Sequence, residues 1–146
     1  MKKISSGKLK AIFKEQDSDT ILRRTNVRRF VVENDIAHIL TGNIILIDFD
    51  GFLQKVNPNG WEGRYQMPRL RTLKDCVRLW NEQFKRFQID KHDMERLIQE
   101  EKITSFKHGN HWVLNYDEVV EALRKYVKTY SGHPIAKKNK RKKPTK

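Results

Sequence analysis

Two aspartates, Asp48 and Asp50, follow the apolar run Ile44–Ile47 in the segment IILIDFDGFL. A carboxylate can act as a nucleophile or as a general acid or base, so two of them at this spacing could share one reaction. The same side chain also commonly caps a helix by accepting hydrogen bonds from free backbone N–H groups. The elements around the two aspartates decide between catalysis and capping.

The segment Asp48-Phe49-Asp50-Gly51 resembles the nucleophile loop of the haloacid dehalogenase-like phosphatases. The resemblance implies that Asp48 attacks phosphorus and that Asp50 serves the leaving group as acid and base. Such an enzyme also needs a later lysine and a further acidic pair at the ends of parallel strands. This chain has neither the length nor the alternating strand–helix pattern for them.

The composition points to a different class of protein. The chain has 146 residues and 37% hydrophobic content, enough for one ordinary core or two very small ones. Its net charge of +13 indicates a polyanionic partner, most often nucleic acid and less often an anionic membrane surface. The single cysteine, Cys76, excludes an internal disulfide and suits a reducing compartment. No apolar run approaches the ~20 residues that span a bilayer. We do not expect MKKISSGK to be a signal peptide, because no hydrophobic stretch follows its lysines. We expect a cytoplasmic, nucleoid-associated protein.

The chain repeats itself at an offset of 67 residues. Residues 5–53 align without a gap on residues 72–120, and eight aligned positions are identical, among them Gly42 and Gly109. Apolar residues align as well, for example Phe30 with Leu97. A shared apolar pattern implies a shared core. The sequence therefore predicts two copies of one small domain.

Each copy has the pattern helix, helix, hairpin and closing helix. In the second copy Thr72 precedes a helix of about ten residues, and Asp90 is the N-cap of a second helix. The segment Ile103–Asn115 predicts a hairpin that turns at Gly109-Asn110. A closing helix follows Asp117.

The repeat also settles the prediction for the two aspartates. Asp50 aligns with Asp117, one residue before a run of helix formers, whereas Asp48 aligns with Asn115. We therefore predict that Asp50 is a helix cap, and we do not expect an enzyme.

The second copy carries a resemblance of its own. The segment IDKHDMERLIQEEKI, Ile89–Ile103, followed by GNHWVLNYDEVVEAL, resembles the excisionase-type, MerR-like winged helix-turn-helix family. Lys91 stands at the basic position of the family's pattern, and Arg96-Leu97-Ile98 matches its Arg-Leu-Ile triplet. Glu95 and Glu101 depart from it. The resemblance extends to the first copy because the first copy aligns with the second. It implies an α+β, mainly α fold with two tandem winged helix-turn-helix domains, each with a hairpin wing, that bind double-stranded DNA.

The expected organisation follows. The first domain covers residues 1–57, a linker residues 58–71, the second domain residues 72–132, and a disordered basic tail residues 133–146. The linker carries Trp61 and Tyr65 among basic residues, so it either contacts DNA or packs the domains together.

The run IAKKNKRKKPTK has seven basic residues and no acid, and without it the net charge falls from +13 to +6. We expect it to anchor phosphates or merely to solubilise the chain. The anchoring candidates are Lys137, Lys138, Lys140, Arg141, Lys142 and Lys143.

The DNA-binding candidates of the first copy form a basic cluster with few acids. They are Arg23, Arg24, Thr25, Arg28 and Arg29. On a helix whose buried stripe is Val27, Phe30 and Val31, the side chains of Thr25, Arg28 and Arg29 point outward. Arginine suits bidentate contact with guanine, so we predict that the first copy reads bases. A solvated basic face is the alternative.

The second copy offers fewer cations, and acids surround them. Its candidates are Lys91, His92 and Arg96 on the second helix and Lys107 and His111 on the hairpin. Trp112 aligns with Ile45 and is expected in the core. Two histidines without a third ligand predict no metal site, and we expect no cofactor.

The sequence thus predicts a sequence-specific double-stranded DNA-binding protein that acts as a monomer with two DNA-binding domains and no membrane partner. By resemblance the leading role is an excisionase-like accessory factor of a mobile element, working beside an integrase. A transcriptional regulator or a plasmid transfer or partition factor is the alternative within this class, and an RNA-binding module is the alternative outside it. Self-association along DNA remains open.

Overall fold

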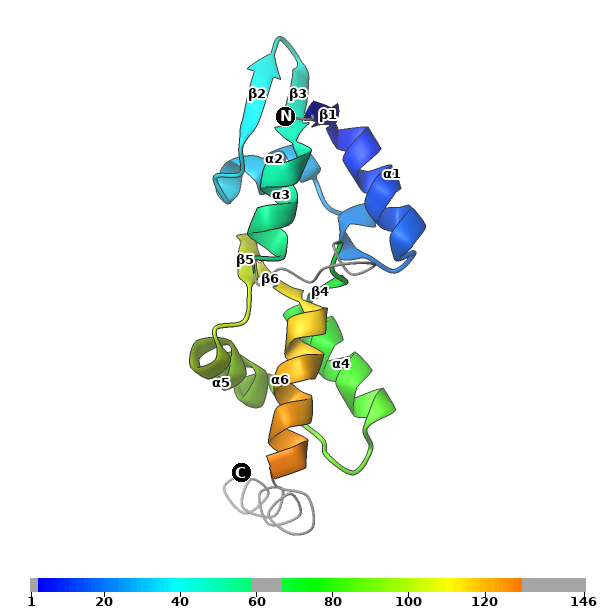
Figure 1. The fold of residues 1–146 in the computed structure, drawn as a ribbon, viewed down its shortest axis with the longest axis vertical. Coiled ribbons are helices and arrows are strands. Elements are labelled where there is room, and N and C mark those ends of the chain that lie inside the picture. Colours follow the sequence, from blue (N-terminus) through cyan, green and yellow to red (C-terminus); the bar gives the residue numbers. More distant parts are fainter. Residues whose placement is uncertain (1–2, 59–66, 130–146) are drawn as a thin grey trace.

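The computed structural model describes residues 3–58 and 67–129. These residues form an α+β fold of six α-helices, a short 3₁₀ helix and two small antiparallel sheets (Figure 1). The expected tail and the middle of the expected linker lie outside the described residues. Within the described part of the chain, no helix is both long and apolar enough to cross a membrane.

The elements fall into two units. The first unit contains β1 (Lys3–Ser5), α1 (Ser6–Gln16), η1 (Ile21–Arg23), α2 (Val27–Glu33), β2 (His38–Thr41), β3 (Ile44–Asp48) and α3 (Phe49–Val56). The second unit contains β4 (Leu70–Thr72), α4 (Leu73–Gln83), α5 (Lys91–Glu101), β5 (Ser105–His108), β6 (His111–Asn115) and α6 (Tyr116–Thr129).

The two units repeat the same backbone at the spacing that the sequence indicated. The bounds of all three strands and of the first helix in each unit differ by the same 67 residues. The sheets have matching orders, β1-β3-β2 and β4-β6-β5. Asp35 and Lys102, the equivalent residues after α2 and α5, both adopt a left-handed φ of 53°. Gly42 and Gly109 both turn their hairpins at a φ of 60°, a conformation that favours glycine.

The third strand of each sheet was not predicted. β1 and β4 are three residues long, and each pairs with the second strand of the hairpin, as in Lys3 opposite Asp48 and Leu70 opposite Asn115. The sequence pattern predicts a two-stranded hairpin and a linker that reaches residue 71. A three-residue strand has too few alternating positions to show a period. The sheet of the second unit therefore begins at Leu70, inside the expected linker.

Helix caps correct the interpretation of the two aspartates. Thr72 and Asp90 are N-caps, as predicted, and Asp90 forms a reciprocal capping box with Asp93. The N-cap of α3, however, is Asp48, whose carboxylate accepts a hydrogen bond from the Gly51 N–H at 3.2 Å. Asp50 lies in the first turn of α3, so the prediction that Asp50 is the cap is wrong.

The same capping occurs in the second unit, where the Asn115 side chain accepts a hydrogen bond from the Glu118 N–H. α6 begins at Tyr116, before Asp117. The helices start earlier than predicted because β3 and β6 pass into them without a loop. The last strand residue therefore supplies the cap.

The units pack against one another through the sheet of the second unit. Leu70, Phe106 and Val113 belong to the core of the first unit, where the Phe106 ring meets Phe30 at a centroid distance of 5.5 Å. The second unit has its own core around Trp80, whose indole N–H donates to the Phe87 carbonyl at 2.7 Å. The hairpin β5–β6 thus stands between the two cores.

Polar contacts cross the same interface. The guanidinium of Arg71 donates two hydrogen bonds to Asp17, at 2.6 and 2.9 Å, and both side chains are largely buried. Burial favours a lower pKa for Arg71, and the hydrogen bonds and charge of Asp17 outweigh it and raise the pKa. The Asn115 side chain also donates to the Val56 carbonyl at 2.8 Å. These contacts fix the orientation of the two units.

Candidate nucleic-acid interface

The predicted basic cluster of the first unit is divided among three local structures. Arg23 ends the 3₁₀ helix, Arg24 is exposed directly after it, and Asn26 caps α2 by accepting from the Arg29 N–H at 3.0 Å. Thr25 does not point outward. It is 3% exposed, and its hydroxyl donates to the Ile21 carbonyl at 2.8 Å. The prediction that Thr25 points outward from the helix is wrong because Thr25 precedes α2, which begins at Val27 after the N-cap Asn26.

Arg28 connects the start of α2 to the turn of the first hairpin. Its guanidinium donates to the Asn43 carbonyl at 3.3 Å, and its side chain is exposed. Among the described residues, no carboxylate forms an ion pair with Arg24 or Arg28. The first unit therefore presents two cations without acidic partners beside a helix N-terminus and a hairpin turn.

Arg29 has a different environment because the second unit lies beside it. Its Nε donates to Glu33 at 2.9 Å, and its guanidinium is within 4 Å of the position a Cβ would take on Gly109. Glu33 also lies 3.1 Å from the His108 ring. Desolvation alone favours a higher pKa for Glu33, but the hydrogen bonds from Arg29 and His108 lower it. Arg29 is thus partly neutralised by a network at the interface.

The candidates on α5 are balanced by nearby acids. Arg96 pairs with Asp93 at 3.2 Å, and the exposed His92 ring lies 3.5 Å from Glu95. Lys91 is exposed at the first position of the helix. Glu95 occupies the position that Arg28 has in the first unit. α5 therefore lacks the uncompensated arginines that distinguish α2.

The second hairpin is held in place by the first unit. Asn34 at the end of α2 donates to the Lys107 carbonyl at 3.0 Å, and Phe106 is buried on Phe30. Trp112 is 40% exposed, so the prediction that it is a core residue is wrong. The Lys107 ammonium lies 4.9 Å from the centre of the Trp112 ring, while His111 is exposed. Lys107 and His111 remain accessible, but the face of the hairpin with Phe106 is occupied.

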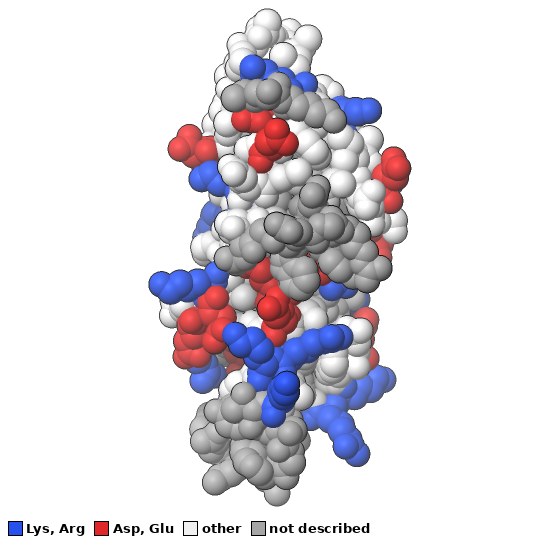
Figure 2. Space-filling model, in the orientation of Figure 1, with Lys and Arg blue, Asp and Glu red and all other residues white. Residues whose placement is uncertain are grey.

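Charge is mixed on the face drawn in Figure 2. Acidic side chains gather over the region of α5, and basic side chains gather over the second half of α6, where Arg124, Lys125 and Lys128 lie. The candidate phosphate anchors of the tail lie outside the described residues. Within the described part of the chain, no three His, Cys, Asp or Glu side chains are grouped as metal ligands.

The residues that join the units are not predicted by the sequence pattern, and the main ones are Arg71, Asp17, Glu33 and His108. Their partners are 54 to 75 residues away in the chain, and no local pattern links them. The alignment of the two copies gives one indication of this ion pair. Arg71 aligns with Ile4 and Asp17 aligns with Phe84, so each charged residue has an apolar equivalent in the other copy.

Comparisons of the chain with protein-family models, with curated proteins and with solved structures found no match.

Proposed function

We propose that this protein binds double-stranded DNA in a sequence-specific manner and that α2 of the first unit is its reading helix. The observation that carries the proposal is the position of Arg24 and Arg28, exposed and without acidic partners among the described residues, beside the N-terminus of α2. A helix with cations at its N-terminal end fits the major groove, and arginine can bond to both acceptors of a guanine edge.

The hairpin next to α2 supports the same proposal. Because Arg28 contacts the Asn43 carbonyl, the start of α2 and the turn of β2–β3 are adjacent, and one duplex could meet both. This order of helices and hairpin fits a winged helix-turn-helix domain, with β2–β3 as the wing. The second unit then positions the complex through Lys91 and Lys107, whose single charges suit phosphates. The excess positive charge adds affinity that does not depend on sequence.

The proposed biological role is that of an excisionase-like accessory factor, which binds near a recombination site and acts with an integrase. A transcriptional regulator or a plasmid transfer factor would use the same interface. No enzymatic activity is proposed, since the Asp48 carboxylate caps α3 by accepting a hydrogen bond from the Gly51 N–H.

The test is binding of Arg28→Ala to a duplex selected from a random pool and to single-base variants of it, by fluorescence anisotropy at fixed salt. We expect a loss of about 1–3 kcal/mol on the selected duplex and a relaxed preference at particular base pairs. Arg78→Ala is the matched control, because Arg78 is an exposed arginine on α4 that pairs with Asp75 and Glu82.

Equal losses from the Arg28 and Arg78 substitutions would show that α2 is not the reading helix. Tighter binding to an RNA hairpin than to any selected duplex would favour an RNA-binding module instead. Deletion of Lys137–Lys146 should weaken binding to all duplexes alike and reduce the salt slope by about 0.9 for each phosphate that the tail no longer neutralises.

A further inference from the structure

The first hairpin has an exposed apolar face. Ile39 is 43% exposed and Ile44 is 58% exposed. In the β2–β3 register Ile39 lies opposite Leu46 and Thr41 opposite Ile44, so these four side chains share one face of the sheet. Adjacent exposed apolar side chains commonly mark an interaction surface.

The equivalent face of the second hairpin is already an interface. Phe106 lies opposite Val113, and both are buried in the core of the first unit. The hairpin contacts α2 through Phe106, which packs on Phe30, and it contacts the residue after the helix, where Asn34 donates to the Lys107 carbonyl. This fold therefore uses this hairpin face to dock on the second helix of a neighbouring unit.

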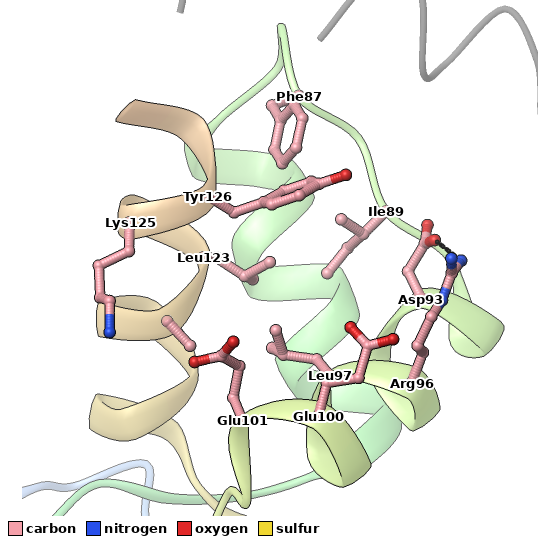
Figure 3. A pocket seen from close by; sticks show the side chains of 11 residues that line it. Phe87, Ile89, Asp93, Arg96, Leu97, Glu100, Glu101, Leu123, Lys125 and Tyr126 are labelled. Atoms are coloured by element: carbon pink, nitrogen blue, oxygen red, sulfur yellow. Dashed lines mark hydrogen bonds and ion pairs between the residues drawn. The ribbon is translucent and has the colours of Figure 1, made fainter. Parts of the chain in front are cut away.

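The surface that would receive such a hairpin is also repeated, and in the second unit it is open. A hollow of about 230 Å³ lies between α5 and α6 (Figure 3). Its lining includes the counterparts of the docking residues of the first unit. Leu97 corresponds to Phe30, Glu100 to Glu33, Glu101 to Asn34 and Leu123 to Val56. We call this hollow, with these four residues, the acceptor groove.

The charges at the acceptor groove are also complementary to those near the first hairpin of a second copy. Glu100 and Glu101 at its rim are exposed, in a chain whose net charge is +13. The end of the molecule with the first hairpin carries exposed Lys3 on β1 and exposed Arg28 beside the hairpin turn. Acids at the groove and cations beside the hairpin attract one another when two copies meet.

The two surfaces cannot meet within one chain. The first hairpin lies at one end of the long axis, whereas α5 and α6 lie in the other half of the molecule (Figure 1). Contact between them requires two molecules and leaves a free hairpin and a free groove at the ends of the pair. A heterologous contact of this kind builds an open series or a ring.

One difference separates the groove from the internal interface. α3 ends at Val56, whereas α6 continues past the equivalent Leu123 to Thr129. Tyr126, on this extension, forms part of the groove wall (Figure 3). The hairpin of a second copy would therefore contact equivalent residues, but its orientation on α5 and α6 would differ from that of β5–β6 on α2 and α3.

We propose that the protein self-associates head to tail, with the Ile39–Ile44 face of one copy docked in the α5–α6 acceptor groove of the next. This inference does not depend on DNA binding, and its test contains no DNA. Sedimentation velocity of the full chain over a range of concentrations measures the association. Ile39→Glu should raise the concentration at half-association at least about tenfold, because it places a carboxylate against Glu100 and Glu101. Val32→Glu is the matched control, since Val32 is 52% exposed on α2 and lies outside the hairpin face.

Mixing variants tests the direction of the contact. Leu97→Glu should block the groove and leave the hairpin intact, so neither it nor Ile39→Glu should associate alone. An equimolar mixture should form a pair that stops at two chains, because one intact hairpin meets one intact groove. If circular dichroism shows that Leu97→Glu is unfolded, the exposed double substitution Glu100→Lys with Glu101→Lys replaces it.

A wild-type chain that remains monomeric at all concentrations overturns the proposal. Association lost in Ile39→Glu but retained in the groove variants indicates a face-to-face contact between hairpins and also overturns it. The same holds if deletion of residues 133–146 abolishes association while Ile39→Glu leaves it unchanged, because the occupant of the groove is then the basic tail.

Discussion

The two units share a backbone but expose different chemistry at equivalent positions. Where the first unit has Arg28 next to its hairpin turn, the second has Glu95, whose neighbour is His92. Where the second unit buries Phe106 against its neighbour, the first exposes Ile39. The two units therefore share a backbone and differ in the side chains that they place at these equivalent positions. The first unit exposes Arg24 and Arg28 without ion pairs among the described residues, whereas the cations of α5 lie beside acidic side chains.

The largest expected effect concerns the ion pair that joins the units. Asp17→Ala leaves the Arg71 guanidinium buried without its partner and should cost about 3–5 kcal/mol of stability. Urea denaturation measures it, with Glu15→Ala on the exposed face of α1 as the control. Replacing both Asp17 and Arg71 by leucine should recover most of the loss, because the equivalent residues Phe84 and Ile4 are apolar. Equal losses for Asp17→Ala and the control would mean that the units are not held by this pair.

The next effect comes from a substitution that makes the second unit resemble the first. Glu95→Arg introduces a cation at the position of Arg28, on a helix where acids now repel phosphates. We expect affinity for random duplex DNA to rise by about 1 kcal/mol at low salt, with a steeper salt dependence. Anisotropy titrations at two salt concentrations measure both. Unchanged affinity would indicate that α5 faces away from the bound duplex.

A smaller effect tests the caps that the units share. Asp48→Ala removes the acceptor for the Gly51 N–H and should cost about 1 kcal/mol of stability. Asp48→Asn should be close to neutral, since Asn115 performs the same task in the second unit. Thermal unfolding followed by circular dichroism distinguishes them. If Asp50→Ala cost more than Asp48→Ala, the assignment of the cap would be contradicted.

The smallest effect concerns the cation on the second hairpin. Lys107→Ala removes the interaction with the partly exposed Trp112 ring and should cost about 0.5–1 kcal/mol of stability. Lys107→Arg should retain most of it. Denaturation of both variants under one set of conditions gives the comparison. A stability change below the error of the method would show that the pair contributes nothing in solution.

The sequence by itself determined the local structure and its repetition. Gly109 permits a turn with positive φ, Thr72 and Asp90 offer acceptors to free N–H groups, and apolar residues at helical spacing define α4 and α5. These features act over four residues or fewer, so they can be read without knowing the rest of the chain. Their recurrence after 67 residues then predicted the second copy from the first.

Only the tertiary structure decided where each local element meets a distant one. β1 makes β3 a central strand, and the end of β3 makes Asp48 the cap of α3. Packing of the second hairpin on α2 buries Phe106 and brings His108 to Glu33, the partner of Arg29, while Arg28 stays without an acid among the described residues. Trp112, unlike Ile45 at the equivalent position, remains partly exposed. Each outcome depends on contacts between residues far apart in the chain, and such contacts leave no periodic pattern in either partner.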